Sequence, residues 1–343
     1  MEALRPAVSI LLPIRRWSKF SSISINSILN QTLSSFELLL IGQNDLDSVR
    51  THMPKDRRIR LLARKAPGIV AALNTGLQHA RGHFIARMDD DDIACPERLQ
   101  VQYDYLRSLS KRHLCATRVR FVDAAGSTKL IAGGYQRYES WLNSMIEPEQ
   151  LKLACFRECP MPHPTLMAHR NIWAQLGGYR AVNAPEDHDL ILRAMLKGIP
   201  LSKPEPVLQL WREHDQRLTH FDQRYRQAAF VERAAWAATR EQSGLALHAG
   251  RGIWLCGTGR HARHWHDALH EYNASVRGFV DLPSSKVDRL KRQLPVIDYA
   301  QLANVRGDDL IISAVTQPQA RNQVIDFMIE QGWTNGSDFL IGG

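Results

Sequence analysis

Short apolar runs alternate with amphipathic stretches through the first 90 residues. Residues 22–29 are loosely helical, and residues 68–79 place Ile69, Leu73 and Leu77 on one helical face. Four other segments are mostly apolar and have the length of a buried strand: residues 8–12, 36–41, 59–63 and 83–88. Strands that alternate with helices predict an α/β fold, with a mostly parallel sheet that helices cover on both faces.

The same alternation of predicted strands and helices begins again after residue 250. Residues 221–244 are helical in character, and beyond them strands are predicted at residues 253–256, 276–280 and 310–315, with a helix at 318–331. This pattern predicts two domains. The first covers residues 1–245 and includes a helical C-terminal extension. The second, residues 250–343, is a small Rossmann-like α/β domain.

Composition permits a globular enzyme and excludes some other classes. Apolar residues make up 44% of the 343 and charged residues 23%, which are ordinary globular values. No apolar run approaches the roughly 20 residues that span a bilayer, and Pro13 and Arg15-Arg16 interrupt the only apolar segment near the N-terminus. Five cysteines without zinc-site spacing predict free thiols. We therefore expect a cytoplasmic protein.

The net charge of +9 is unevenly placed. Residues 246–343 carry ten basic and ten acidic side chains, so the excess lies in residues 1–245, with 34 basic and 25 acidic side chains. This excess of positive charge favours binding of a diphosphate or an acidic glycan, or peripheral contact with an anionic membrane. No nucleic-acid recognition motif accompanies the charge, and nucleic acid is not an expected partner. Whether the protein forms a homo-oligomer stays open.

Four consecutive aspartates, Asp89 to Asp92, follow the predicted strand 83–88. Ligands of parallel sheets bind beyond the carboxyl ends of the strands, which is where these side chains stand. Adjacent carboxylates repel one another, and Mn²⁺ or Mg²⁺, which prefer oxygen ligands, would offset that repulsion. Such an ion can neutralise a departing phosphate group. One alternative stays open, in which Asp92 only caps the helix that begins near residues 96–98.

A second acidic segment, Glu186-Asp187-His188-Asp189, precedes an apolar stretch of helical character. A carboxylate there could take the proton from an attacking hydroxyl group. Acidic residues are also common in the first turn of a helix, where they complement the helix dipole, so this segment alone leaves both readings open.

Taken together, these segments resemble the inverting glycosyltransferases of family 2, which have the GT-A fold. The resemblance runs in order over residues 7–220. It rests on VSILLP at 8–13, SILNQT at 27–32, FEL at 36–38, GIVAALNTGLQHARGHFIARMDDDDIACPERLQVQ at 68–102, HPT at 163–165, GGY at 177–179, PEDHDLILRA at 185–194 and WR at 211–212. It implies non-processive, metal-dependent transfer of a hexosyl or N-acetylhexosaminyl group from a nucleotide-sugar donor. The implied acceptor is a glycan or lipid-linked glycan of bacterial cell-surface polysaccharide synthesis.

The resemblance also implies roles for single residues. Asp91 and Asp89 would bind the metal, Asp89 and Asp90 would lie at the donor, and Asp187 would deprotonate the acceptor. The other implied site residues are Pro13, Gln43 and Lys65 on the donor side, and His163, Thr165 and Glu186 at the acceptor or the pocket floor. For Lys65 the plain alternative is surface charge, and for His163 it is a structural role.

One position departs from the family pattern. The family follows its second strand with paired acids, one of which touches the nucleobase, whereas this chain has Gln43-Asn44-Asp45. The Gln43 amide can hydrogen-bond a base edge, and Asp45 or Asp47 are further candidates. The donor nucleotide is therefore left open.

The second predicted domain carries a motif of its own. Gly257 and Gly259 follow a predicted strand and open a helix, and Asp281 stands 24 residues after Gly257, at the end of another strand. This is the order of a dinucleotide fingerprint, in which glycines let a phosphate approach a helix N-terminus. The segment resembles the nucleotide-binding half-domains of bacterial sugar acyltransferases. Three readings stay open for this domain: a bound nucleotide or nucleotide-sugar, a bound NAD, and a purely structural or assembly module.

A rival hypothesis keeps the same fold without catalysis. In it the chain is a nucleotide-sugar binding or scaffold protein, and the altered position at Gln43 favours this reading. Both hypotheses predict metal-dependent nucleotide binding, but only an enzyme consumes the donor.

Overall fold

A computed structural model describes residues 5–42, 46–110, 112–129, 131–217, 220–282 and 289–343. The chain forms two compact units. The first unit consists of Met1–Leu151, Pro160–Ala181 and Gly198–Phe221, and the second unit of Lys152–Cys159, Val182–Lys197 and Asp222–Gly343. This grouping differs from the predicted division at residues 245–250, because three segments from before residue 245 belong with the C-terminal sheet.

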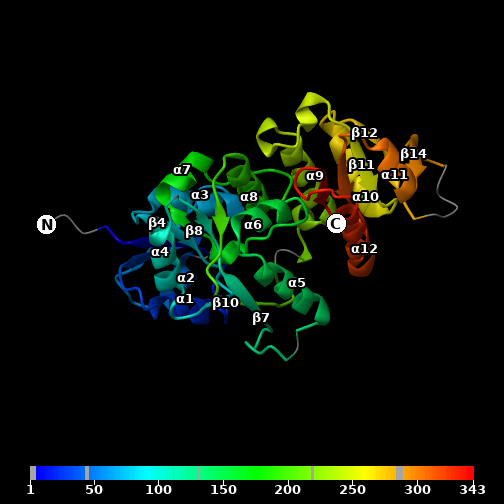
Figure 1. Cartoon of the computed structure of the whole chain (residues 1–343). Coiled ribbons are helices and arrows are strands. Elements are labelled where there is room, and N and C mark those ends of the chain that lie inside the picture. Colours follow the sequence, from blue (N-terminus) through cyan, green and yellow to red (C-terminus); the bar gives the residue numbers. More distant parts are fainter. Residues whose placement is uncertain (1–4, 43–45, 111, 130, 218–219, 283–288) are drawn as a thin grey trace. The chain divides into compact units, whose positions relative to one another are not determined.

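The first unit is built on a seven-stranded sheet in the order β3-β2-β1-β4-β8-β6-β9. Its parallel half consists of β1 (Val8–Pro13), β2 (Phe36–Gly42), β3 (Ile59–Ala63) and β4 (Phe84–Arg87). The other half contains β8 (Met167–His169), which is antiparallel to β4 and β6, with β6 (Leu114–Cys115) and β9 (Leu201–Ser202) parallel to each other. β4 and β8 lie side by side (Figure 1). The α/β class predicted from the alternating pattern is confirmed.

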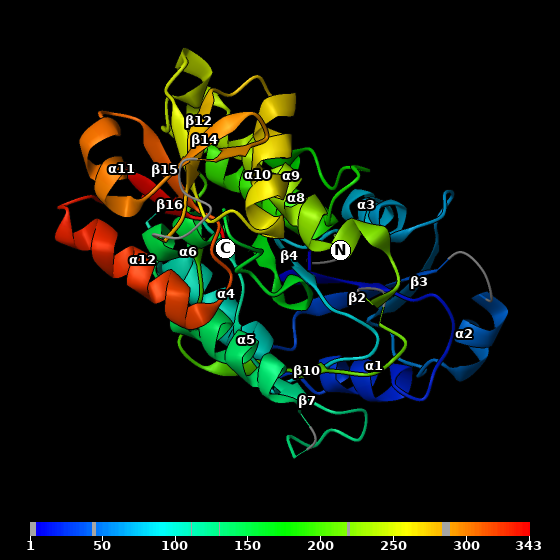
Figure 2. The same ribbon diagram turned by 90° about the vertical axis from the view of Figure 1, so that its right-hand side faces the viewer.

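Helices cover both faces of the parallel half. Figure 2 shows α1 (Ser21–Leu29) and α2 (Leu46–His52) on one side of these strands and α3 (Ile69–His79) on the other. Ile25 and Ile28 of α1 are fully buried in the core together with alternate residues of β1 and β2. This packing removes apolar surface from water and fixes the edge of the sheet at which β4 ends.

A three-stranded sheet lies next to that edge in the chain's first unit. β10 (Val207–Arg212) pairs antiparallel with β5 (Ile93–Ala94) and parallel with β7 (Arg118–Val122). The stacked rings of Phe121 and Trp211, 5.0 Å apart, hold β7 against β10. Three helices complete this unit: α4 (Arg98–Ser108), α5 (Gly133–Ser144) and α7 (Arg170–Leu176). β5 begins directly after the four aspartates, so the β5–β10 pairing brings β10 to them.

The second unit contains a six-stranded sheet in the order β13-β14-β12-β11-β15-β16. Its strands are β11 (Ile253–Cys256), β12 (Val276–Val280), β13 (Leu290–Lys291), β14 (Leu294–Ile297), β15 (Leu310–Ser313) and β16 (Phe339–Ile341). All neighbours pair in parallel except β13 and β14. Figure 2 shows α10 (Arg260–Glu271) on one side of these strands, and α11 (Tyr299–Val305) and α12 (Pro318–Glu330) on the other.

The second unit also contains helices from earlier in the chain. α9 (Gln227–Ala238) packs against both α8 (Glu186–Leu196) and α10. Small buried side chains, among them Ala234, Ala235 and Ala238, let the neighbouring helices approach α9 closely. α6 (Pro148–Ala154) ends in this unit. None of the helices in the described ranges is long and apolar enough to cross a membrane, and all five cysteines are free thiols.

Candidate active site

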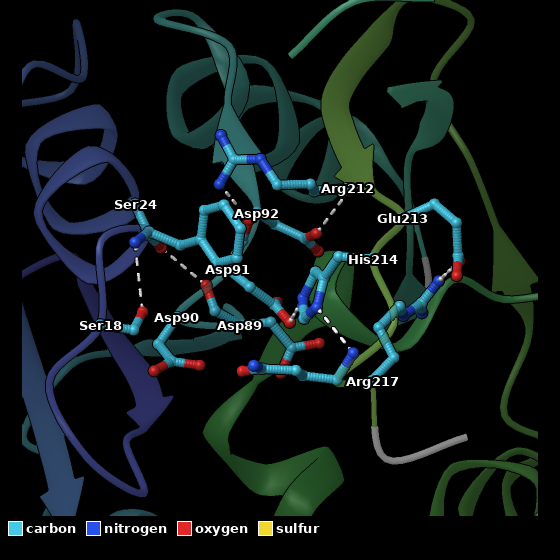
Figure 3. A network of polar contacts seen from close by, with 12 residues as sticks. Ser18, Ser24, Asp89, Asp90, Asp91, Asp92, Arg212, Glu213, His214 and Arg217 are labelled. Carbon is cyan, nitrogen blue, oxygen red and sulfur yellow. Dashed lines mark hydrogen bonds and ion pairs between the residues drawn. The ribbon is translucent and has the colours of Figure 1, made fainter. Parts of the chain in front are cut away.

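The four aspartates form a tight turn between β4 and β5 (Figure 3). One carboxylate oxygen from each of Asp89, Asp91 and Asp92 lies within 4.8 Å of the other two. The Asp89 carboxylate forms an ion pair with Arg87 of β4, with Nη1 and Oδ2 2.5 Å apart. The predicted clustering of carboxylates at the end of this strand is therefore what the structure shows.

Helix α1 holds the main chain of this turn in place. The Ser24 hydroxyl donates to the Asp89 carbonyl at 2.7 Å, and the Ser27 hydroxyl accepts from the Ala94 amide at 3.1 Å. Gln31 donates to the Cys95 carbonyl and accepts from the Leu99 amide, at 2.7 and 2.8 Å. Two residues of the segment SILNQT, Ser27 and Gln31, thus hold the main chain that directly follows the four aspartates.

Asp91 is partly exposed and contacts a histidine from beyond β10. His214 Nε2 lies 2.9 Å from Asp91 Oδ2, and Arg212 Nη1 donates to the Asp91 carbonyl at 2.6 Å. Burial alone would raise the pKa of Asp91, but the hydrogen bond from His214 and the charge of Arg217 outweigh it and lower that pKa. Asp91 is therefore an ionised carboxylate, able to bind a cation.

Asp92 has a different function from the helix cap considered for it above. It is fully buried, and it accepts from the Arg212 amide at 2.9 Å and from Gln209 Nε2 at 3.2 Å. Burial and the charges of Asp91 and Asp89 raise its pKa, while Arg217 and the Arg212 amide oppose them. Asp92 therefore attaches β10 to the turn. α4 begins after Glu97 without any side-chain cap.

Asp90 points toward α1. Its Oδ2 accepts from the Ser21 hydroxyl at 3.4 Å. Burial, together with the charges of Asp91 and Asp89, raises the pKa of Asp90 to about 8. Asp90 is thus largely protonated at neutral pH when no cation is bound.

The acidic turn fits a hard divalent cation. Asp89 and Asp91 offer partly exposed carboxylate oxygens, and the turn brings three carboxylates within reach of one ion. Mg²⁺ and Mn²⁺ are bound by such oxygen sets. His214 lies beside them, with its Nε2 2.9 Å from Asp91 Oδ2 and its Nδ1 accepting from the Gln216 amide.

His214 and its neighbours were not predicted from sequence. The side chains of Arg217 and His220 contact Glu213 at 2.8 and 2.6 Å, and the Arg217 guanidinium lies over the Trp211 ring. His214 is 123 residues from Asp91. The nearest signal in the sequence was Trp211-Arg212, which ends just before it.

Other predicted residues of the first unit lie on the same sheet or beside it. Pro13 ends β1, and Lys65 is exposed in the turn between β3 and α3. Gln43, Asn44 and Asp45 lie outside the described residues. Asp47 is exposed, in the first turn of α2.

His163 and Thr165 are buried in a 3₁₀ turn, His163–Thr165. His163 Nε2 lies 3.0 Å from the Tyr179 hydroxyl, and burial together with Arg87 holds the pKa of His163 well below its usual range. Thr165 donates to the Pro162 carbonyl and accepts from the Thr117 amide. Tyr179 follows Gly178. The φ of Gly178 is +71°, a conformation that favours glycine, and a Cβ at this position would lie only 2.6 Å from Asn74 Oδ1.

The acidic segment of the second unit forms the first turn of α8, and its four residues differ in environment. Glu186 is buried and accepts from the Tyr225 hydroxyl at 2.8 Å. Asp189 is buried and forms ion pairs with Arg193 and Arg233. His188 Nε2 lies 2.8 Å from the Cys155 carbonyl, and burial lowers the pKa of His188 to about 4. Asp187 is the one of the four that is partly exposed.

The glycine motif of the second unit opens onto a cavity of about 840 Å³. Gly257, Gly259 and Asp281 all line it. The three residues of this motif therefore share one cavity in the second unit.

Comparison with known proteins identifies the family. The Glycosyl transferase family 2 model matches residues 9–173. WbnJ of Escherichia coli, an O-antigen biosynthesis glycosyltransferase, is 28% identical over 196 residues, which cover 55% of this chain and 71% of WbnJ. The "Putative glycosyltransferase EpsE" of Bacillus subtilis (strain 168) is 30% identical over 202 residues, which cover 56% of this chain and 68% of EpsE.

The crystal structure of residues 1–349 of S. aureus TarS in complex with UDP-GlcNAc is similar in fold. The two structures superpose with a TM-score of 0.51 at 14% sequence identity, over 68% of this chain and 66% of that one. This likeness supports the GT-A fold. Because the family model and the match to EpsE agree, the chain belongs to glycosyl transferase family 2 and is a glycosyltransferase.

Proposed function

We propose that this enzyme transfers a hexosyl or N-acetylhexosaminyl group, with inversion, from a nucleotide-sugar to a glycan or lipid-linked acceptor. The observation that carries the proposal is the acidic turn, which places Asp89 and Asp91 beyond the carboxyl end of β4. Ligands of parallel α/β sheets bind at this edge. We propose that single sugars are added without processive synthesis.

Asp89 and Asp91 would hold Mn²⁺ or Mg²⁺, with His214 beside them. When bound, the cation would neutralise the negative charge that develops on the leaving diphosphate. The protein's own contribution is to keep these ligands in place: Arg87 orients Asp89, and Arg212 and Ser24 fix the main chain of the turn. Asp90, Pro13 and Lys65 are proposed on the donor side.

Asp187 is proposed as the base that takes the proton of the acceptor hydroxyl. Glu186 and Asp189 are buried and hydrogen-bonded to Tyr225 and to Arg193, respectively. Asp187 keeps partial exposure at the first turn of α8. A general base of this kind contributes roughly 10²–10⁴-fold to the rate. His163 and Thr165 of the first unit, and Glu186 of the second, are proposed as further acceptor or pocket residues.

The acceptor is proposed to belong to bacterial cell-surface polysaccharide synthesis, in keeping with the O-antigen biosynthesis named for WbnJ. The basic excess in residues 1–245 suits a lipid-linked acceptor at an anionic membrane surface. We place the enzyme at the cytoplasmic face of that membrane.

The test is a set of single amide substitutions. Nucleoside diphosphate release is measured from UDP- and GDP-sugars with Mn²⁺ and a lipid diphosphate acceptor. Asp187→Asn and Asp91→Asn should each lower the rate by about 10²-fold or more. The matched control, Asp104→Asn, changes an exposed aspartate on α4 and should leave the rate unchanged.

Two further measurements separate the roles. Asp91→Asn should weaken Mn²⁺ binding in calorimetry, whereas Asp187→Asn should not. NMR of the product should show the anomeric configuration opposite to that of the donor. Transfer that persists undiminished in Asp187→Asn, or in EDTA, would contradict the proposal.

A further inference from the structure

The cavity of about 840 Å³ in the second unit lies where several parallel strands end. Residues that directly follow β11, β12, β14 and β15 line it, among them Gly257, Asp281, Asp298 and Ala314. Its volume falls within the range of roughly 300–1,000 Å³ of small-molecule sites. The acidic turn belongs to the first unit, so this cavity is not the donor site proposed above.

Two helix N-termini open onto the cavity without side-chain caps. α10 begins after Gly259 and α12 begins after Gln317, and neither of these N-cap residues makes a side-chain hydrogen bond to its helix. Both residues line the cavity. The first amide N–H groups of a helix need acceptors, and the helix dipole adds partial positive charge there. An anionic group on a ligand would provide those acceptors.

Gly257 gives the ligand room at the first of these helices. Its φ is +97°, a conformation that side chains rarely adopt, and its amide donates to the Val280 carbonyl at 2.7 Å. The nearest atom to a Cβ placed at Gly257 would be 3.5 Å away, and at Gly259 nothing lies within 4 Å. The turn is therefore open on the side from which a phosphate could approach.

His261 points independently to a ligand. Its side chain is 7% exposed and lines the cavity, and its Nδ1 has no hydrogen-bond partner among the described residues. Its Nε2 donates to the Gly342 carbonyl. Burial lowers the pKa of His261, which keeps the ring neutral and makes Nδ1 an acceptor. A buried acceptor without a donor favours a ligand that offers a hydroxyl or N–H group.

Asp281 offers a second acceptor. The Thr258 hydroxyl donates to Oδ2 and the Leu282 amide donates to Oδ1. Because Asp281 lines the cavity, its carboxylate stands where the hydroxyl groups of a ribose would approach. An acidic residue after the second strand, together with glycines after the first, is the arrangement that binds a ribose and its phosphate.

The opposite wall of the cavity is apolar. Tyr299 of α11 and Phe327 of α12 pack edge to face, with ring centroids 5.2 Å apart, and Val315 and Val324 lie with them along the cavity. Such a wall suits the flat, weakly polar face of a nucleobase.

We propose that this cavity binds a nucleoside phosphate, at a second nucleotide site separate from the donor site. The base would lie against Tyr299 and Phe327, the ribose near Asp281 and His261, and the phosphate at the N-termini of α10 and α12. A second hollow shares Gln227, His261 and Thr316 with the cavity. Arg157, Glu158 and Arg321 also line that hollow, so a longer phosphate chain would meet two guanidinium groups and one carboxylate.

The experiment is calorimetry of the full chain in EDTA, with ADP, GDP and UDP as separate titrants. Without a divalent ion the donor site is not expected to bind, so heat of binding reports the second site. Asp91→Asn should bind like the wild-type protein. Ala320→Trp places a large ring into the cavity from the first turn of α12 and should weaken binding by about tenfold or more.

Asn322→Trp is the matched control, because residue 322 is exposed on the same helix and does not line the cavity. Equal melting temperatures of the two tryptophan variants would show that both are folded. Asp281→Asn should also weaken binding, without adding bulk. If none of the three nucleotides binds in EDTA, or if Ala320→Trp binds as well as Asn322→Trp, the proposal is wrong. If Asp91→Asn loses sugar transfer but still binds a nucleotide in EDTA, the donor site and the cavity of the second unit are two separate sites.

Discussion

Asp91 and Asp92 are neighbours with the same side chain, yet their replacement by asparagine should have different consequences. Asp91 is partly exposed and faces His214, whereas Asp92 is buried between Arg212 and Gln209. We expect Asp92→Asn to destabilise the first unit, and Asp91→Asn to affect stability little while weakening metal binding.

The magnitude follows from the donors around Asp92. An asparagine keeps one oxygen, which can accept from the Arg212 amide, and its NH₂ group then faces Gln209 Nε2, another donor 3.2 Å from Asp92 Oδ2. Gln209 cannot turn its amide over without cost, because its Oε1 accepts from Arg98 Nη1 at 2.9 Å. In either arrangement a buried polar group stays unsatisfied, at about 1–3 kcal/mol. The expected loss of stability is therefore about 1–3 kcal/mol.

For Asp91→Asn the cost is smaller. The Asp91 side chain is 25% exposed, and the amide oxygen of an asparagine can still accept from His214. The expected loss of stability is about 1 kcal/mol or less.

The assay is urea unfolding in EDTA at neutral pH, followed by tryptophan fluorescence. Hydrogen exchange of residues 84–94 and 207–212 shows whether the loss is located at the turn and β10. The reasoning is refuted if Asp91→Asn costs more than Asp92→Asn. A cost near zero for Asp92→Asn would mean that Asp92 carries a proton in the folded protein, which an asparagine imitates.

Two further predictions follow from the contacts of other acidic residues. Without metal, the pKa of Asp90 is about 8 in the folded protein, against 3.8 for an ordinary aspartate. Protonated Asp90 therefore contributes to stability fully below pH 3.8, and this contribution is lost as the pH rises toward 8. Mn²⁺ binding near pH 7 should therefore release a proton, seen by calorimetry in buffers of different ionisation enthalpy; equal release from Asp90→Asn would contradict this. Tyr225→Phe removes the hydroxyl that donates to buried Glu186 and should cost the second unit about 1.5–3 kcal/mol in urea unfolding. An unchanged midpoint would show that Glu186 does not depend on this donor.

Much of the first unit could be predicted from local patterns. The strands at residues 8–12, 36–41 and 59–63 were apparent because buried parallel strands are continuously apolar, and Asp89 to Asp92 followed a predicted strand directly. The helix at residues 68–79 was predicted from its apolar face and forms α3. These features could be predicted because each is determined by residues that are close together in the sequence.

Features that depend on distant pairing were not predicted. β10 reaches the acidic turn through its antiparallel pairing with β5, more than 110 residues earlier, and only this pairing brings His214 to Asp91. The difference between Asp187 and its neighbours Glu186 and Asp189 likewise depends on Tyr225 and Arg233, which follow about 40 residues later. No spacing within residues 186–189 distinguishes one carboxylate from another.

The position of α9 between α8 and α10 has a practical consequence for anyone who wishes to shorten this protein. A polypeptide cut at residue 245 would retain the helix of Asp187 but would lose α10, and the alanine-rich surface of α9 would be left to water. Newly wetted apolar surface of this kind promotes aggregation. The transferase should therefore be purified with its last hundred residues attached, even by those interested only in sugar transfer.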